Sequence, residues 1–498
     1  MRYNVLRVRL THEIELACHA GVSEISIRPE ITHLTLTPFE EHMFFDDVPE
    51  YPMTGFFRLR FSGCLQAEAL DAAIQTTISR NPLVRSRIVR NAQNELCWEL
   101  ADSPTIPLAA WSADTQGEFP AGDYIDLTQS IGMRIWLVTR KGAHDLVVQI
   151  HHACTDALGM CHLIDDLLVS YAQLVGDVLS HTELRLLNSD QLPTRNRFGL
   201  TGRRLLQLLP KQILSLGIVG RFFLRRAVPL RPPAVDQSIV ASATFPAVCV
   251  FEFSRCETER LLSEAKDRQV TVNDLIARDL FLAIDRWRSQ DAVGTPSDWI
   301  RFFVPINERT PDDRTLSAAN VMSGVFLERT PLQMTNAETL LRSIQSEIRT
   351  VRLARLGLLF IGTHWFLRRI PRLRNLVIRR SGCLASCVFS NLGIVLNRTP
   401  LQRQDGQICI GNVRLEGVDF FAPLRPFTHV TICIVTYAER LSVDLQFDPQ
   451  AISRPQAEQL LACVVEQIRD SMRSDEAATG SIEQFHLTPA TTPSGHTT

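Results

Sequence analysis

The sequence predicts an α/β (α+β) protein of two lobes, each a mixed sheet packed with helices. Three observations lead to this prediction. The chain of 498 residues is too long for one ordinary hydrophobic core. Short apolar runs typical of strands alternate along it with segments of helical periodicity. A basic linker at residues 191–240 separates an N-terminal lobe, 36–190, from a C-terminal lobe, 241–480.

The composition is that of a globular protein. Hydrophobic residues make up 45% of the chain, charged residues 21%, and the formal net charge is -2, so no bulk charge favours nucleic-acid binding. No run of eighteen apolar residues predicts a membrane span, and Met1–Pro29 lacks the uninterrupted apolar core of a signal peptide. Twelve cysteines without a CxxC pair favour reduced thiols and a cytoplasmic location.

The N-terminal lobe is predicted to begin with a strand at Phe56–Phe61 and a helix at Ala67–Ser79, whose apolar residues share one face. Pro82 ends that helix, and the arginines after it begin the next strand. Met133–Thr139 and Leu146–Ile150 are then predicted to form a hairpin around a Lys-Gly turn.

A histidine pair follows this hairpin. His151 and His152 lie where the buried strand ends, in a loop that leads to a helix beginning near Leu158. A neutral imidazole can take a proton from an alcohol or amine near pH 7 if a second group holds its tautomer. Asp156 can orient the ring or form a buried ion pair that holds the loop.

The residues alone leave a structural histidine at a strand end open as the alternative. Adjacent side chains on an extended strand point to opposite faces, so we do not expect His151 and His152 to share a metal ion.

The loop resembles a known motif. His151-His152-x-x-x-Asp156-Ala157 is similar to the HHxxxDG signature of the chloramphenicol-acetyltransferase-like acyltransferases, which include peptide-synthetase condensation domains, wax-ester synthases and alcohol acetyltransferases. Ala157 replaces the glycine of that family, and an alanine is strained in any turn that needs a positive φ. Cys154, at a variable position of the motif, is expected to be a packing residue rather than a nucleophile.

Further segments resemble the same family in the same order, which counts for more than any single motif. They are similar to the family's opening and to its RHxxLR, VPxxxR, GN and SN-G segments, and they comprise Leu36–Glu40, Arg80–Arg87, Phe303–Arg309, Asn320–Gly324 and Ser390–Gly393. The resemblance covers Leu36–Met472. The DFGWG-type segment of the plant branch has no counterpart, and Phe420–Phe427 occupies its region.

The C-terminal lobe is predicted to contain a strand at Val248–Phe253 and a helix at Glu257–Lys266, followed by a helix that Thr271 caps. A final hairpin and a closing helix are predicted at Val430–Thr436, Leu441–Phe447 and Gln456–Met472.

The resemblance implies two chloramphenicol-acetyltransferase-like lobes with an active-site channel between them. It implies that His152 is the general base, that His151 holds the loop, and that Asp156 keeps His152 in place through an ion pair. Arg85 and Arg301 are the expected partners of Asp156. Substrate-binding or oxyanion-stabilising residues are expected at Asn273, Ser323, Ser390 and Asn391.

The activity that the resemblance implies is transfer of an acyl group from a thioester to a hydroxyl acceptor. Neither a metal nor a bound cofactor is expected, because the donor, an acyl-CoA or a phosphopantetheine-linked acyl group on an acyl-carrier protein, is itself a substrate. Two alternatives stay open: a stand-alone condensation enzyme that forms an amide, and a catalytically silent homologue that binds a carrier protein or a lipid. The alanine at position 157 is the observation that supports a catalytically silent homologue.

Two stretches without acidic residues, 195–231 and 351–380, each carry eight arginines among apolar blocks. They suit ordinary helices that cover the lobes, and the alternative is a basic amphipathic surface that lies on an anionic membrane. Residues 1–35 match no family segment and are predicted to be an N-terminal extension, and residues 481–498 to be a disordered tail.

Overall fold

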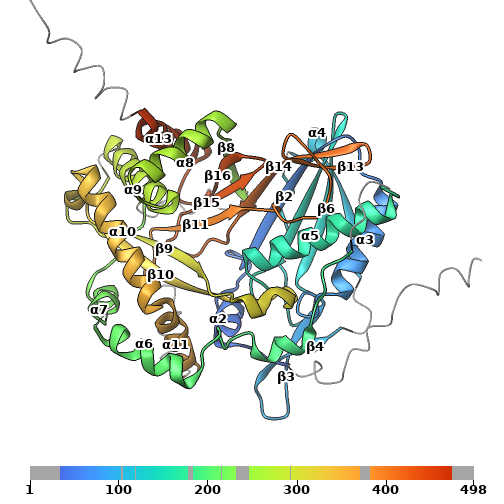
Figure 1. Ribbon diagram of the computed structural model, residues 1–498, viewed down its shortest axis with the longest axis horizontal. Coiled ribbons are helices and arrows are strands. Elements are labelled where there is room, and N and C mark those ends of the chain that lie inside the picture. Colours follow the sequence, from blue (N-terminus) through green and yellow to red (C-terminus); the bar gives the residue numbers. More distant parts are fainter. Residues whose placement is uncertain are drawn as a thin grey trace, which may run out of the picture.

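The structure is a computed structural model, and it describes residues 34–101, 105–117, 119–177, 183–214, 216–231, 246–291, 293–370 and 382–473. Two lobes lie side by side, each with its own sheet and helices (Figure 1). The predicted mixed α/β architecture is confirmed. The predictions for most of the N-terminal extension and for the tail fall outside the described residues.

The N-terminal lobe is built on a seven-stranded sheet of order β12-β13-β14-β2-β7-β6-β5. Its first four strands in chain order are β2 (Thr54–Ser62), β5 (Leu108–Ser112), β6 (Met133–Arg140) and β7 (Ala143–His151). Helices α3 (Ala67–Ser79) and α5 (Ala157–Leu174) cover one face (Figure 1). The helices bury their apolar faces against the sheet in one continuous core.

A smaller sheet of order β1-β4-β3 flanks this lobe, with strands β1 (Leu34–Thr35), β3 (Ser86–Arg90) and β4 (Leu96–Leu100). Between β1 and β2 runs helix α2 (Pro38–Asp46), which begins at a capping box formed by Thr37 and Glu40. The short helix α4 (Ala113–Gln116) follows β5.

The C-terminal lobe is built on a six-stranded sheet of order β10-β9-β11-β15-β16-β8. The strands are β8 (Ala247–Glu252), β9 (Ile300–Asn307), β10 (Met322–Arg329), β11 (Cys387–Ile394), β15 (Val430–Tyr437) and β16 (Arg440–Phe447). A second core joins this sheet to helices α8 (Arg255–Asp267), α9 (Val272–Gln290), α10 (Ala337–Ala354) and α13 (Arg454–Arg473).

Strands β12 (Arg403–Gln404), β13 (Gln407–Ile410) and β14 (Val413–Phe421) cross the predicted lobe boundary. They belong to the sheet of the N-terminal lobe, where β14 pairs antiparallel with β2 and Phe420 lies opposite Phe57. The boundary that places residues 241–480 in one lobe is therefore wrong for this segment. A division by chain position cannot reveal that a late strand completes an early sheet.

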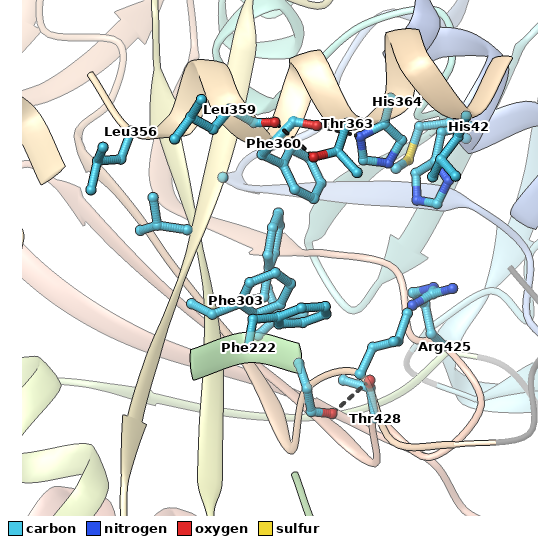
Figure 2. A pocket seen from close by; sticks show the side chains of 18 of the residues that line it. His42, Phe222, Phe303, Leu356, Leu359, Phe360, Thr363, His364, Arg425 and Thr428 are labelled. Atoms are coloured by element: carbon cyan, nitrogen blue, oxygen red, sulfur yellow. Dashed lines mark hydrogen bonds between the residues drawn. The ribbon is translucent and has the colours of Figure 1, made fainter. Parts of the chain in front are cut away.

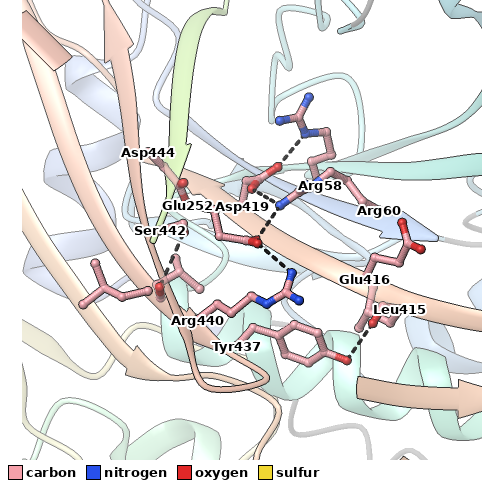
Figure 3. Close-up of polar contacts among 12 residues, drawn as sticks. Arg58, Arg60, Glu252, Leu415, Glu416, Asp419, Tyr437, Arg440, Ser442 and Asp444 are labelled. Atoms are coloured by element: carbon pink, nitrogen blue, oxygen red, sulfur yellow. Dashed lines mark hydrogen bonds and ion pairs between the residues drawn. The ribbon is translucent and has the colours of Figure 1, made fainter. Parts of the chain in front are cut away.

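Charged side chains reinforce this crossing (Figure 3). Arg58 of β2 donates to Asp419 of β14 over 2.6 Å. Arg60 donates to Glu252 of β8 over 3.1 Å, and so links the two sheets. The buried Asp444 of β16 accepts a hydrogen bond from the backbone amide of Phe420. Burial and the nearby Asp419 raise the pKa of Asp444 well above its usual range.

The basic segment between the lobes forms the 3-10 turn η2 (Ser189–Thr194) and two helices, α6 (Gly202–Leu214) and α7 (Leu216–Leu224). Two further 3-10 turns are η4 (Pro311–Thr315) and η5 (Pro331–Met334), and the second acid-free segment contains helix α11 (Gly357–Arg368). Helices α6, α7 and α11 gather at one corner of the molecule (Figure 1).

Candidate active site

The histidine loop leaves the centre of the larger sheet. Strand β7 lies between β2 and β6 and ends at His151. The amide of His151 donates to Gly132 O over 2.8 Å, and the amide of His152 donates to Met53 O over 2.7 Å. Backbone hydrogen bonds on both sides thus hold the two histidines at the sheet edge that faces the other lobe.

His151 is fully buried and has a structural environment. Its Nδ1 accepts a hydrogen bond from the amide of Ala153 over 3.0 Å, so the ring proton resides on Nε2. Nε2 lies 3.4 Å from Oδ2 of Asp47, whose Oδ1 accepts from the amide of Met53. The side chain therefore connects its own loop to the segment that precedes β2, as expected of a residue that holds the loop.

His152 differs from its neighbour, because the residue is only partly buried. Its Nδ1 atom is enclosed. Burial lowers the pKa of His152. A hydrogen bond with its own backbone and the negative charge of Asp156 raise the pKa, but burial outweighs them. A lowered pKa favours the neutral imidazole near pH 7, the form that accepts a proton.

Asn320, from the other lobe, holds the backbone beside this ring. Its Nδ2 donates to His152 O over 2.7 Å and to Ala153 O over 2.8 Å. Asn320 precedes β10, so the C-terminal lobe determines where the histidine loop lies.

Asp156 is the N-cap of α5 and also joins the lobes. Oδ1 accepts from the amide of Gly159 over 2.9 Å, and Oδ2 accepts from Arg309 Nη1 and from the amide of Val321, each over 2.8 Å. Burial alone raises the pKa of Asp156, but Arg309 and the two amides outweigh burial and lower it. Nη2 of Arg309 donates to Ala319 O, which completes the contact.

The two expected partners of Asp156 are wrong. Arg85 donates to Ser79 O within its own lobe, and Arg301 is paired with Glu328 over 2.5 Å. Arg301 is still a structural ion-pair residue, but it serves the C-terminal sheet. Arg309 makes the contact because β9 ends beside the histidine loop, whereas Arg301 lies at the other end of that strand.

Ala157 is not strained in this loop. It is the first residue of α5, and its φ is not positive. The position that requires glycine is 159, where an added Cβ would lie 2.0 Å from Thr155 Oγ1 and 3.2 Å from Ala319 O. Gly159 thus allows α5 to approach the backbone of the other lobe.

Cys154 is a packing residue, as expected. Its side chain is buried in the core of the N-terminal lobe, and burial raises the pKa of the thiol above its usual range. A thiol held in its protonated form is a poor nucleophile.

The structure does not bring the four expected substrate-binding residues together. Asn273 lies in the first turn of α9, in the outer helices of the C-terminal lobe, and no described contact joins it to the histidine loop. Ser323 is buried and donates to Glu308 Oε1 over 2.7 Å. Asn391 accepts from the amide of Gly393 in a β-bulge. Ser390 lies on the face of β11 opposite the helices, the same face as Val388.

An apolar cavity of about 210 Å³ lies between the lobes (Figure 2). Most of its wall is aromatic or aliphatic, and the residues that line it include Phe222, Phe303, Phe326, Leu356, Leu359, Phe360, Leu367 and Val388. Gly324 of β10 lets the ring of Phe303 lie against the strand, because an added Cβ would approach that ring to 2.2 Å. Such a wall suits the apolar part of a ligand.

Phe39 of α2 connects this cavity with the histidine loop. Its ring centroid is 6.1 Å from that of His152, 6.2 Å from that of Phe360 and 6.3 Å from that of His364. At this end of the cavity, the rings of His42 and His364 meet in a T-shaped arrangement with centroids 4.3 Å apart (Figure 2). The ring of Phe39 therefore lies between His152 and two residues of the cavity wall, Phe360 and His364.

Helix α2 is itself firmly positioned. Glu40 is fully buried and accepts from Arg195 over 2.6 Å and from Trp98 Nε1 over 3.1 Å. At the other end of the helix, Asp46 is paired with Arg425. A charged residue of the interlobe segment and one of the C-terminal half thus hold the helix that carries Phe39.

Sequence reasoning missed four positions of the candidate site: Asn320, Arg309, His42 and His364. Asn320 and Arg309 lie inside segments that resemble the family, so both could have been found by examining the polar residues of those segments. His42 and His364 come from helices of different lobes, and no local pattern connects them.

No group of three or more His, Cys, Asp or Glu side chains in the described part of the chain could hold a metal ion. Among the described helices, none is long and apolar enough to cross a membrane.

The fold is that of a known group of solved structures. The first condensation domain of the calcium-dependent antibiotic synthetase, in complex with a substrate analogue, matches with a TM-score of 0.64 and 14% identity over 88% of this chain and 96% of that chain. The trichothecene 15-O-acetyltransferase from Fusarium sporotrichioides matches with a TM-score of 0.61 and 11% identity over 88% and 95%. Polyketide synthase associated protein 5 from Mycobacterium tuberculosis matches with a TM-score of 0.56 and 15% identity over 90% and 99%.

No protein-family model and no curated protein sequence matches the chain. The structural matches confirm the two-lobed chloramphenicol-acetyltransferase-like fold that the sequence resemblance predicts. At these identities the comparisons define the fold, and the chemistry depends on the site.

Proposed function

We propose that this protein is an acyltransferase that moves an acyl group from a thioester to a hydroxyl acceptor, with His152 as general base. The donor is an acyl-CoA or an acyl group on a carrier protein. The observation that carries the proposal is His152 itself, a partly buried histidine with a lowered pKa at the junction of the two lobes, which the ring of Phe39 connects to an apolar cavity.

In the proposed reaction, Nε2 of His152 takes the proton of the acceptor hydroxyl as its oxygen attacks the thioester carbonyl. The carbon–sulfur bond then breaks, and the departing thiolate recovers that proton from the imidazolium. Nδ1 is enclosed, which leaves Nε2 as the ring nitrogen that can face a substrate. A general base contributes about 10²–10⁴-fold to the rate, and holding both substrates in place supplies much of the remainder.

Asp156 has a positioning role in this proposal. Arg309 and two backbone amides occupy its carboxylate oxygens, and its lowered pKa makes it a poor proton acceptor. It holds the loop between the lobes, while Asn320 holds the backbone of His152 directly.

The apolar cavity is proposed to hold the hydrocarbon part of the acyl group or of the acceptor. A wall with so few polar groups would leave a charged head group unpaired, so the charged end of either substrate belongs outside the cavity.

Formation of an amide is the second candidate function, because condensation domains are among the structures with this fold. The same base would then take a proton from an amine. The catalytically silent alternative loses its main support, since Ala157 adopts an ordinary helical conformation.

The test is consumption of a panel of acyl-CoA and acyl-carrier thioesters with pooled alcohols and amines, with thiol release followed and products identified by mass. We expect acceptor-dependent release by the wild type and a loss of at least about a hundredfold in His152→Ala. His144→Ala, at the opposite end of the same strand, is the matched control and should retain activity. Equal rates for wild type and His152→Ala in a folded protein would overturn the assignment of the base.

The rate should also depend on pH. Because the pKa of His152 is lowered, the acid limb of kcat/KM should lie below pH 6.5, the ordinary histidine value. An acid limb above that value would contradict the proposal.

A further inference from the structure

Exposed apolar side chains concentrate at one corner of the molecule. Of the fourteen large hydrophobic residues that are exposed in the described chain, eight lie in two segments, 202–224 and 353–370. They are Leu206, Leu209, Ile213, Leu224, Leu353, Trp365, Phe366 and Ile370. Scattered single residues of this kind are normal on a surface, but a concentration of them marks a site of contact.

Exposed cations lie in the same segments and in the few residues that flank them. Within residues 202–226 and 349–370, the exposed basic residues are Arg203, Arg204, Lys211, Arg221, Arg226, Arg349, Arg352 and Arg369. No aspartate or glutamate occurs in residues 195–231 or 348–370. In a chain with a formal net charge of -2, this corner is strongly positive.

The two segments form one surface, which we call the α6–α11 face: helices α6, α7 and α11 and the end of α10. Gln212 of α6 donates to Ala354 O at the end of α10, and Arg355 donates to Phe198 O just before α6. Phe222 of α7 stacks on Phe326 with centroids 4.7 Å apart, and Phe360 of α11 lies against the same ring. Figure 1 shows the three helices together.

The inner side of this face lines the apolar cavity. Phe222 comes from α7, and Leu359, Phe360, Thr363 and Leu367 come from α11. The same helices thus present apolar residues outward to solvent and inward to the cavity (Figure 2).

We propose that the α6–α11 face binds the surface of an anionic lipid bilayer and that an apolar chain enters the cavity from the lipid. The cations of this face can pair with the phosphate groups of the lipids. The exposed Leu, Ile, Phe and Trp side chains between them can insert among the acyl chains beneath. Trp365 is 53% exposed, and Arg369 lies over its ring at 3.4 Å, a pair suited to the membrane interface.

Membrane binding goes beyond the proposed function and can fail or hold independently of it. Entry of a chain into the cavity rests on the proposed function and deepens it, because it makes one substrate lipid-like.

The first experiment measures co-sedimentation of the full chain with phosphatidylcholine vesicles that contain or lack 30% phosphatidylglycerol. We expect binding that needs the anionic lipid and falls at least tenfold in 0.5 M NaCl, because salt screens the attraction. Arg203→Glu with Arg204→Glu should weaken binding at least tenfold, and so should Trp365→Ser with Phe366→Ser. None of these residues lines the cavity, so turnover of a water-soluble thioester and acceptor should stay unchanged.

The matched control lies on α8, at the other end of the C-terminal lobe in Figure 1. Arg260 and Leu262 are exposed there, and Arg260→Glu with Leu262→Ser changes the same kinds of side chain. This variant should bind vesicles like the wild type. An equal loss in the α8 variant, or no sedimentation with anionic vesicles, would overturn the proposal.

A second readout uses fluorescence. The structure describes all six tryptophans of the chain, and only Trp365 among them is exposed. Vesicles with brominated acyl chains should quench the wild type and not Trp365→Phe. If anionic vesicles bind without any quenching of Trp365, the α6–α11 face is not the surface inserted. If the face variants change self-association instead of vesicle binding, it is an interface between copies of the chain, and the membrane proposal fails.

Discussion

Arg309, just after strand β9, donates a hydrogen bond over 2.8 Å to Oδ2 of Asp156, the N-cap of α5, although 153 residues separate the two in the chain. This contact joins the lobes at the loop that carries His152. The catalytic geometry proposed above therefore depends on how the lobes pack and not only on the motif.

Arg309→Met should destabilise the protein by about 3–5 kcal/mol, because it leaves the buried Asp156 carboxylate without its cationic partner. The measurement is the midpoint of urea unfolding. Arg314→Met, at an exposed arginine nearby, is the control and should change stability by less than about 0.5 kcal/mol. An Arg309 variant as stable as this control would show that the ion pair does not hold the lobes.

Gly159→Ala should also loosen the contact between the lobes. The new Cβ would lie 2.0 Å from Thr155 Oγ1 and 3.2 Å from Ala319 O, so the Thr155 side chain or α5 must shift, at a cost of about 1–3 kcal/mol. Adding Thr155→Ala should restore part of this stability, because it removes the nearer atom. Failure of the second change to restore any would place the strain elsewhere.

Asn320→Asp tests whether the C-terminal lobe positions His152. The two side chains have the same shape, but an ionised carboxylate cannot donate to the carbonyls of His152 and Ala153. We expect a drop in kcat of at least about tenfold and a loss of about 1–3 kcal/mol of stability. Asn320→Ala should lower kcat and stability less, since it removes the donor without adding a charge that the carbonyl oxygens repel. A larger loss in Asn320→Ala than in Asn320→Asp would argue against the role of Asn320 in positioning His152.

Stability should decrease as the pH falls through 6.5. Burial lowers the pKa of His42 and of His364, so the unfolded chain, with ordinary histidines, takes up protons first. The free energy of unfolding is therefore unaffected by these histidines above pH 6.5, the pKa of a histidine in the unfolded chain. Below that pH it falls, by up to about 1.4 kcal/mol per histidine at pH 5.5. Urea unfolding at pH 7.5 and 5.5 measures this difference. It should shrink in His42→Gln, and an unchanged difference would contradict the assignment to this pair.

Val388→Phe should change the preference for chain length. Val388 lines the cavity of about 210 Å³ from strand β11, and a phenyl ring there fills part of that space. We expect KM for long-chain substrates to rise about tenfold or more, at an unchanged KM for short ones. Competition between a long and a short thioester in one assay measures this directly. An equal effect on both substrates would mean that the cavity holds neither chain.

Local features of the fold follow from the sequence closely. The predicted helix Ala67–Ser79 has the bounds of α3, and the predicted hairpin differs from β6 and β7 by a few residues at its ends. Helical periodicity, a proline stop and a Lys-Gly turn act over short distances, so a single segment contains the information.

The sequence by itself determined the succession of strands and helices, the histidine loop and its resemblance to an acyltransferase motif. Only the tertiary structure decided that Arg309 and not Arg85 or Arg301 pairs with Asp156, that β14 completes the first sheet, and that α2, α7 and α11 enclose one cavity. Several arginines could satisfy a buried carboxylate by charge alone. The packing of distant strands selects the one whose guanidinium reaches it.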